Sequence, residues 1–346
     1  MSASFVSLPA ALRNALIAGT PVITPNKRLA RRLVALYDAA QRAEARTVWA
    51  GAVAMPWDAW LRGLWQDLTA ESARTLPRLL PPVAEAYLWQ RVVNADGMAL
   101  MDHVGAAALA ADAWSLWHAW GTGSETFRAW RDGHLTEDTA AFARWAEAFS
   151  GELAHRGCID GAMLADSLRA AAADETRWIA GDVCLAGFNE TTPQQQRLLA
   201  ALGRAGLRIT HCLSVGESAA TPTRAHPATP REEIAAALTW AADVLHSRPD
   251  AHVGIVIEDL VACREEVVAL AKAILDPGAL LPGAAATARP FDLSLGEPLS
   301  ALALPAAALG LINLGSAALP MGEAAALLRS PYLPAGAAGV GWVNGG

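Results

Sequence analysis

The sequence predicts an α/β protein in which a doubly wound parallel sheet is interrupted by a helical insertion. Three observations carry this prediction. Short apolar runs alternate with amphipathic helical stretches before residue 56 and again after residue 174. Between these regions the periodicity is helical, without a clear strand. Eleven of the 13 tryptophans lie between Trp49 and Trp178. Alternating strands and helices are typical of a parallel sheet with helices on both faces.

The first predicted strand is the apolar run at 22–24, which lies between Pro21 and Pro25. A helix is expected from 26 to about 45, because several apolar residues fall on one arc at about 100° per residue: Leu29, Leu33, Leu36 and Tyr37. The opposite arc carries basic residues: Lys27, Arg28, Arg31 and, at its edge, Arg32. A second short strand is expected within 48–54, before Pro56.

The insertion is predicted to contain five helices, over 58–68, 82–95, 105–120, 136–156 and 161–173. Its tryptophans indicate an aromatic core separate from that of the sheet. One aromatic group has the spacing i, i+3, i+4 and i+6: Trp114, Trp117, His118 and Trp120. This group is either a base-stacking strip or ordinary helix packing, and the spacing is typical of packing.

Alternation resumes with a predicted strand at 182–187 and a helix that begins at Thr192, with proline at its first position and glutamine at its third. A strand at 207–213 and a polar linker at 214–227 follow.

Further elements are predicted downstream. A second capping box at Thr229 opens a helix to about 246, and 253–257 is the clearest buried strand in the chain. Helices are expected at 260–275, 299–313 and 321–329, before a Gly/Ala-rich end.

The length, composition and net charge of the chain limit its domain number and its possible partners. A length of 346 residues suggests two or three domains, and 53% hydrophobic residues allow a large core. The net charge of −7 excludes general attraction to nucleic acid, so any such contact needs a local basic patch. Neither a signal peptide nor a long uninterrupted apolar run is recognised, so we expect a cytoplasmic protein without a membrane partner.

Metal chemistry is not expected within this chain. The four cysteines, at 158, 184, 212 and 263, form no C-x-x-C pair, and the eight histidines lack ligand spacing. Buried free thiols are therefore predicted. Glu258 and Asp259 follow a predicted strand, where they could hold a metal or a ribose or could cap a turn.

The two lysines exclude two familiar motifs. A Walker A loop needs Gly-Lys-Ser/Thr, but Lys27 follows asparagine and Lys272 follows alanine. A Glu/Asp-x-Lys nuclease signature is absent as well, because Pro25 and Leu270 stand two residues before the lysines. No catalytic residue and no cofactor are therefore assigned.

The best candidate site lies at the end of the first predicted strand: Thr24, Asn26, Lys27, Arg28, Arg31 and Arg32. Ligands of open α/β sheets bind at the carboxyl ends of the strands, where a helix N-terminus attracts anions and arginines match phosphate. From 26 to 46 the local charge is +4. The alternative is an ordinary solvated helix face.

A second candidate is the strand, turn and helix at 185–195. A Walker B motif would place acidic residues at the strand end to hold magnesium, but Ala186 and Gly187 stand there. This segment is either a site or a structural turn in which Gly187 allows an unusual backbone and Thr192 caps the helix.

Four segments in this order resemble the AddB/RexB-like bacterial DNA-repair proteins, relatives of superfamily 1 helicases. VITPNKRLARRL at 22–33 resembles their opening, and LAGFNETTPQQQ at 185–196 resembles their degenerate Walker B strand and the next helix. Two further matches are PFDLSLG at 290–296 with Pro298-Leu299, and LLRSPYL at 327–333.

The resemblance implies a RecA-like (P-loop NTPase-like) domain from 1–56 and 176–222, an all-helical insertion at 57–175, and the start of a second helicase-like half at 223–346. Full-length members are exonuclease-type and carry a RecB-family nuclease domain. This chain would cover only the helicase-like part, with its ATPase motifs missing, so no activity is expected from it alone. What the resemblance transfers is the strand-end position with which helicases touch single-stranded DNA: Thr24, Asn26, Lys27 and Arg28.

Three hypotheses follow. The first is a catalytically inactive helicase-like module that binds or scans single-stranded DNA for a nuclease domain or helicase subunit in DNA repair and recombination. The second is a protein-interaction scaffold that binds a partner subunit through the Trp-rich helices without touching DNA. The third is an α/β enzyme acting on a small or nucleotide substrate.

Overall fold

The computed structural model of the protein describes residues 8–71, 75–121, 130, 133, 136–174, 181–212, 221–282, 290–294, 296, 298–316 and 318–333. The chain forms two compact units, Met1–Ser218 and Ala219–Gly346. The boundary lies in the segment expected to be a linker, whose first part, 214–220, is outside the described residues. The Gly/Ala-rich end from 334 onward is outside them as well.

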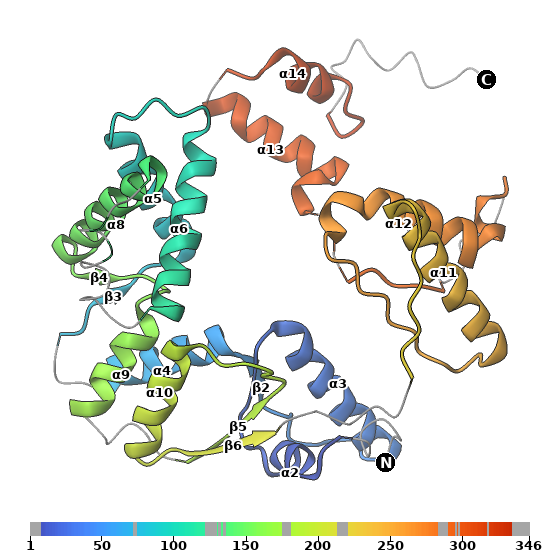
Figure 1. Ribbon diagram of the computed structural model, residues 1–346, viewed down its shortest axis with the longest axis horizontal. Helices are drawn as coiled ribbons and strands as arrows, with labels where there is room; N and C mark the ends of the chain where they lie inside the picture. The colour runs from blue at the N-terminus through green and yellow to red at the C-terminus, as the bar shows by residue number, and fades with distance from the viewer. Residues whose placement is uncertain are drawn as a thin grey trace. The chain divides into compact units, whose positions relative to one another are not determined.

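A four-stranded parallel sheet organises the first unit (Figure 1). Its strands, in spatial order, are β2 (Ala54–Pro56), β1 (Val22–Thr24), β5 (Asp182–Ala186) and β6 (Arg208–Cys212). Val22 pairs with Cys184, which confirms the prediction that these two distant segments share a sheet. β2 lies later than the predicted 48–54, because β1 is only three residues long and its ladder aligns Val22 with Ala54.

Helices cover both faces of this sheet, as a doubly wound α/β protein requires. α2 (Ala10–Ala18) and α3 (Lys27–Ala43) share a buried cluster with Val22, Cys184 and Cys212 on one face. α4 (Trp57–Glu71), α9 (Leu164–Asp174) and α10 (Pro193–Arg204) share another with Ile23 and Leu185. Neighbouring strand residues therefore point to opposite layers. The predicted α/β class is confirmed, and α2 is an additional helix that the sequence pattern does not predict.

The insertion has its own core. α5 (Pro82–Ala95), α6 (His103–Trp120) and α8 (Glu137–His155) bury a shared cluster, in which the rings of Trp89 and Phe149 stack with centroids 4.0 Å apart. The segment is not all-helical, contrary to the prediction. Two short parallel strands, β3 (Arg78–Leu79) and β4 (Cys158–Ile159), pair within it. Strands of two residues have no detectable periodicity, so the sequence pattern does not reveal them.

The second unit contains α11 (Pro230–Ser247) and α12 (Leu260–Leu275), which bury Ile234, Leu238 and Val267 between them. Further along come two 3₁₀ turns, Pro277–Leu280 and Leu299–Ala301, and the helices α13 (Ala303–Ser316) and α14 (Met321–Leu328). The capping box at Thr229 is formed as predicted.

The predicted strand at 253–257 is wrong. This segment has no strand assignment, because none of the described residues supplies a hydrogen-bonded neighbour for it, and a strand is defined by its ladder. Among the helices that the structure describes, none is long and apolar enough to cross a lipid bilayer.

Candidate nucleic-acid interface

The candidate site lies where the order of the parallel strands reverses. From β1 the chain passes through α3 to β2 on one side, and from β5 it passes through α10 to β6 on the other. The carboxyl ends of β1 and β5 are therefore adjacent, and this is the position at which open α/β sheets bind their ligands.

Thr24, at the end of β1, has a structural position. Its side chain is fully buried, and its hydroxyl donates to the carbonyl of Asn26 at 2.8 Å and lies 3.3 Å from that of Met55. The hydroxyl hydrogen is thus used inside the protein, where it ties β1 to the turn and to β2.

Asn26 is exposed and is the N-cap of α3. Its side-chain oxygen accepts a hydrogen bond from the backbone N–H of Leu29 at 2.9 Å, which satisfies one of the helix's free donors. The positive end of the helix dipole still faces outward here, next to the basic side chains of the first turn.

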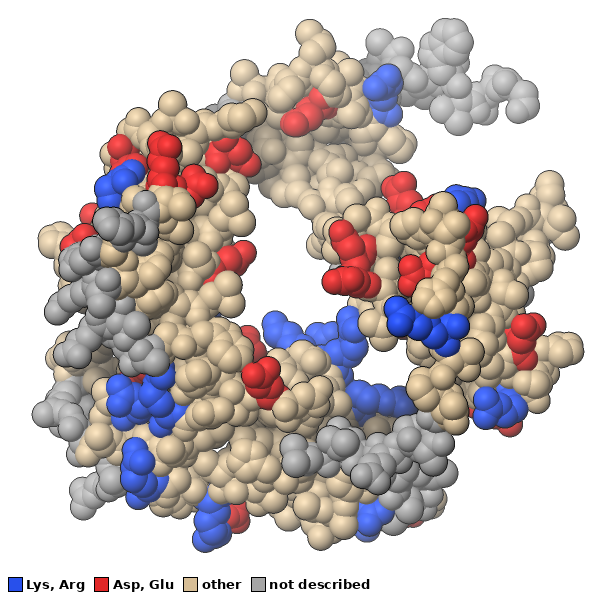
Figure 2. Space-filling view, in the orientation of Figure 1, with Lys and Arg blue, Asp and Glu red and all other residues tan. Residues whose placement is uncertain are grey.

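Four exposed basic side chains follow on the first two turns of α3: Lys27, Arg28, Arg31 and Arg32. Lys27, Arg31 and Arg32 form no ion pair with any residue that the structure describes. Figure 2 shows Lys and Arg side chains gathered over α3. Among the described residues, no carboxylate neutralises the charge of Lys27, Arg31 or Arg32.

The basic residues near the other end of this helix are engaged. The guanidinium of Arg42 lies 5.7 Å from the ring centre of Trp49, and Arg46 pairs with Glu44 at 3.1 Å. The available positive charge is therefore concentrated at the beginning of α3, beside the strand end.

A hollow of about 430 Å³ adjoins the basic residues. Lys27 and Arg31, one helical turn apart, lie on one side of it, and Ala54, Pro56 and Ala59 on the other. The small side chains let a flat or extended ligand approach the helix closely, and the two cations could meet neighbouring phosphates.

The position that a nucleotide phosphate would need is closed. Only Pro25 and Asn26 connect β1 to α3, whereas a Walker A loop needs a longer glycine-rich turn. At the end of β5, Gly187 adopts φ +79° and lies directly against Leu29 and Pro25. Apolar packing thus fills the space between the two strand ends.

The candidate segment at 185–195 is a structural turn in its local contacts. Thr192 and Gln195 form the predicted capping box at the start of α10. Gln194 donates to the carbonyl of Ala162 and to Asp166, both at 2.8 Å. These bonds attach α10 to α9 and to the loop before it.

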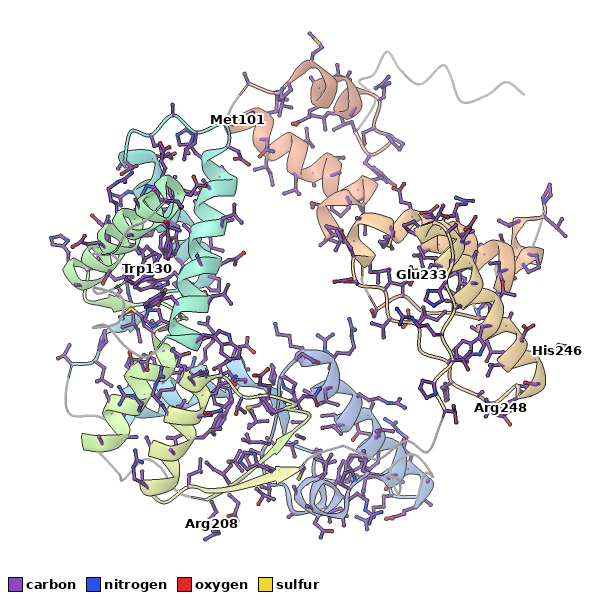
Figure 3. All side chains as sticks on the ribbon, in the orientation of Figure 1. Met101, Trp130, Arg208, Glu233, His246 and Arg248 are labelled. Atoms are coloured by element: carbon purple, nitrogen blue, oxygen red, sulfur yellow. The ribbon has the colours of Figure 1, made fainter. Side chains whose placement is uncertain are left out.

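The aromatic group on α6 is not a free stacking strip. Trp114 is buried and donates its Nε1–H to Asp160 at 2.8 Å, and the Trp117 ring lies 5.3 Å from that of Trp130, which Figure 3 labels. His118 contacts Trp114 with ring centres 4.4 Å apart. Of this group only Trp120, with 49% of its surface exposed, remains for outside contact. Packing is the confirmed interpretation for Trp114.

The structure also contains a polar cluster around the buried Asp160, where the insertion meets α10, that the sequence pattern does not predict. Asp160 accepts from Trp114 and from the backbone N–H of Met163 at 2.9 Å, while His118 Nδ1 lies 3.5 Å from Asp166. Glu85 accepts from the backbone N–H of Gly161 at 2.9 Å. The members of this cluster come from α5, α6, α9 and the turn before α9, so no local motif could reveal it.

The carboxyl groups of this cluster titrate abnormally. Burial raises the pKa of Asp160 and that of Glu85 above their ordinary values. For Asp166, burial raises the pKa, but hydrogen bonds from His118 and Gln194 outweigh it and leave the pKa lowered. The hydrogen bond from Gln194 to Asp166 joins this cluster to α10, the helix that follows β5.

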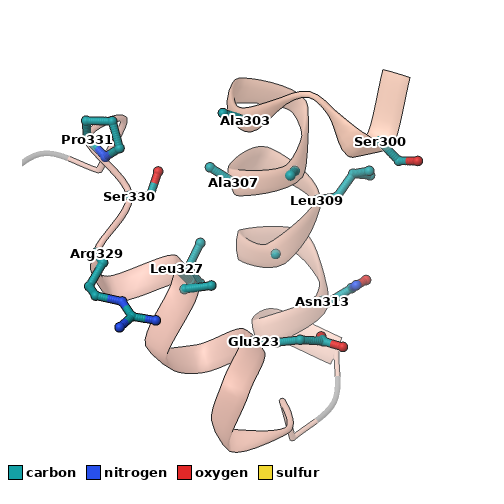
Figure 4. A pocket seen from close by; sticks show the side chains of 13 residues that line it. Ser300, Ala303, Ala307, Leu309, Asn313, Glu323, Leu327, Arg329, Ser330 and Pro331 are labelled. Atoms are coloured by element: carbon teal, nitrogen blue, oxygen red, sulfur yellow. The ribbon is translucent and has the colours of Figure 1, made fainter. Parts of the chain in front are cut away.

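Asp259, of the candidate pair Glu258 and Asp259, is the N-cap of α12. Asp259 accepts from the backbone N–H of Ala262 at 3.1 Å, so it caps α12 as the alternative interpretation proposed. The described residues contain no group of three or more side chains suited to a metal, and the four cysteines are free. A cavity of about 530 Å³ lies between α13 and α14. Its lining side chains are mostly small and apolar and include Glu323 and Arg329 (Figure 4).

Comparison with known proteins gives no match: no protein-family model fits the sequence, and no curated protein is significantly similar to it.

Proposed function

We propose that this chain is a catalytically inactive helicase-like module of a DNA-repair protein, which holds single-stranded DNA for a nuclease domain or helicase subunit. Its α/β part would be a degenerate RecA-like domain of the AddB/RexB-like group. DNA would cross the carboxyl end of β1 and contact the beginning of α3 through its phosphates.

The observation that carries the proposal is the row of cations at this strand end. Lys27, Arg31 and Arg32 are exposed and unpaired among the described residues, on a chain whose net charge is −7. An acidic protein with exposed cations on two turns of one helix has a local surface suited to a polyanion.

The packing at the strand ends supports binding without hydrolysis. A two-residue connection and the contact of Gly187 with Leu29 occupy the region where an ATP phosphate would lie. The cations lie outside this region, on the solvent side of α3, so they favour an extended backbone ligand over a nucleotide enclosed in a cleft.

The test is the affinity for fluorescein-labelled oligothymidylate of about 20 nucleotides, measured by anisotropy over a range of salt concentrations. Lys27→Ala, Arg28→Ala and Arg31→Ala together should weaken binding to any sequence to a similar degree. The slope of log affinity against log salt should fall by up to about 0.7 for each phosphate that the variant no longer neutralises.

A matched control removes three charges elsewhere in the same unit: Arg42→Ala, Arg46→Ala and Arg204→Ala. It changes net charge equally, so a general electrostatic effect would weaken both variants alike. If the strand-end variant keeps the parental affinity and salt slope, the DNA-binding proposal is wrong.

The scaffold alternative has one observation in its favour. Leu109, Leu116 and Trp120 are exposed along α6 at spacings that place them on one helix face, and Leu109 is 71% exposed. Leu109→Glu with Leu116→Glu should abolish partner binding if the scaffold hypothesis holds, and should leave oligothymidylate affinity unchanged if the proposed DNA site is correct.

A further inference from the structure

The segment 252–257 of the second unit combines a buried-strand sequence with an exposed position. Its residues HVGIVI are mostly apolar, yet Val256 is 97% exposed and Ile255 is 36% exposed. Such a β-branched run is typical of a sheet interior, where both neighbours and faces are covered.

The backbone of this segment is also unpaired. Ala251 donates to the carbonyl of Arg248, but from His252 to Ile257 no backbone hydrogen bond reaches any described residue. The side chains differ in their surroundings: Val253 and Ile257 are partly buried, and Ile257 packs on the α11–α12 core, while Val256 is exposed and lies outside the cavity lining. One face of the segment thus packs on the helices as a β-strand would, but its backbone has no hydrogen-bonded neighbouring strand among the described residues.

A second segment lies on the same helix pair. Phe291 and Leu293 pack on the α11–α12 core, and Pro290–Ser294 lines the same cavity as Val253 and Ile255. This cavity measures about 540 Å³, and its floor is apolar, with Leu238 and Val267 among its residues. Among the described residues, no backbone hydrogen bond joins the two segments. We name this cavity and the edge at 252–257 the strand slot.

We propose that the strand slot accepts a β-strand from a partner polypeptide, which pairs with 252–257 and covers the apolar floor. A helix or a lipid could cover apolar surface, but only another strand also satisfies a row of backbone N–H and C=O groups. Alternating apolar residues would face the helices, since that face of the slot is apolar.

The carboxylates around the slot predict the charge at the ends of the partner strand. Asp292 lines the slot, and Glu258 follows the segment at one end; Glu258 takes part in no ion pair with a described residue. A strand with lysine or arginine at its ends would complement these carboxylates. The proposal concerns the second unit and does not depend on DNA binding by the first.

The experiment is hydrogen–deuterium exchange on the full chain with an acetylated and amidated synthetic peptide, KTVTVTVK, at increasing concentration. The control peptide KTVTPTVK has proline in place of the central valine and cannot complete a ladder. The active peptide should slow exchange of the amides of 252–257 by about tenfold or more, and the control peptide should not.

Two variants identify the edge. Ile255→Pro removes the central donor of the segment and should abolish protection, while costing no native hydrogen bond; circular dichroism should confirm that the helices persist. Leu280→Asp changes an exposed leucine of the same unit that does not line the slot, and should bind the peptide like the parent.

Three results would overturn the proposal. The peptide could fail to protect 252–257, or it could protect the Ile255→Pro variant equally. Alternatively, the segment could be protected without peptide in proportion to chain concentration, which would assign the slot to a second copy of this chain.

Discussion

Gly187, at the end of β5, lies directly against the side chain of Leu29 in the first turns of α3. A Cβ atom added at Gly187 would overlap Leu29 Cδ2 and lie 3.6 Å from Pro25 Cδ. The φ of +79° also places Gly187 in the left-handed region, where other residues are strained. This contact joins the two strand ends and positions the beginning of α3, and with it the basic residues.

Gly187→Ala should therefore lower the free energy of unfolding by about 1–3 kcal/mol, from steric overlap and left-handed backbone together. Urea denaturation measures it. Adding Leu29→Ala removes the overlap but not the backbone strain, so the two changes should cost less together than the sum of each alone. A Gly187→Ala protein as stable as its parent would show that the contact does not constrain α3.

ATP should neither bind tightly nor be hydrolysed. The reason is geometric: two residues connect β1 to α3, and apolar packing fills the strand ends where phosphate and magnesium would sit. Calorimetry with millimolar ATP and magnesium should show no binding, and phosphate release should match the buffer blank with or without oligothymidylate. Turnover that disappears when one specific residue is replaced would contradict the prediction.

Replacing Thr24 should change the stability of the chain, whereas replacing Arg31 should change its affinity for DNA. Thr24→Val keeps the shape of the side chain but removes the donor to the Asn26 carbonyl, and should cost about 1 kcal/mol of stability. Oligothymidylate affinity should change little. Arg31→Ala should leave stability nearly unchanged and should weaken oligothymidylate binding, because Arg31 is exposed and unpaired among the described residues. Urea denaturation measures the stability of both variants, and anisotropy measures their affinity for oligothymidylate. If Thr24→Val bound as weakly as Arg31→Ala, the Thr24 hydroxyl would belong to the DNA interface.

Local signals in the sequence predict much of this fold. Both capping boxes, at Thr192 and Thr229, are formed because the groups involved lie three residues apart and need no tertiary context. α3 is predictable because its leucines share one face and Asn26 caps it. The exposed cations of the candidate site follow from the same periodicity, since a residue opposite a buried face faces solvent.

The features that local signals do not predict depend on partners distant in sequence. The run at 253–257 has the composition of a buried strand, but the described chain provides no neighbour for it. The burial of Thr24 follows from the approach of the Met55 carbonyl, 31 positions away. Trp114 and Asp160 are 46 positions apart, and no periodicity relates an indole on α6 to a carboxyl group in the turn before α9.

The polar cluster around Asp160 predicts a pH dependence of stability with a definite sign. Burial raises the pKa of Asp160, which is 3% exposed, so the folded chain holds this proton more tightly than the unfolded chain. Stability from this group is fully present below the ordinary aspartate value of 3.8 and is lost as pH rises through the raised pKa. The contribution of Asp166 has the opposite pH dependence. Its lowered pKa stabilises the folded chain above pH 3.8, and this stability is lost as the pH falls through the lowered pKa.

Asp160→Asn and Asp166→Asn should therefore respond to pH in opposite directions. Trp114 and the Met163 N–H donate to different oxygens of Asp160, and asparagine replaces one of these oxygens by an NH2 group that cannot accept, so Asp160→Asn should cost about 1–3 kcal/mol. That cost should be largest near pH 3 and shrink toward pH 7, because asparagine lacks the proton linkage that favours the folded parent at low pH.

The cost of Asp166→Asn should instead grow with pH, since the bonds from His118 and Gln194 favour the charged carboxylate. Urea denaturation of parent and both variants at about pH 3, 5 and 7 measures the two trends. If the cost of Asp160→Asn rose with pH as well, the pKa of Asp160 would be lowered in the folded chain and not raised by burial.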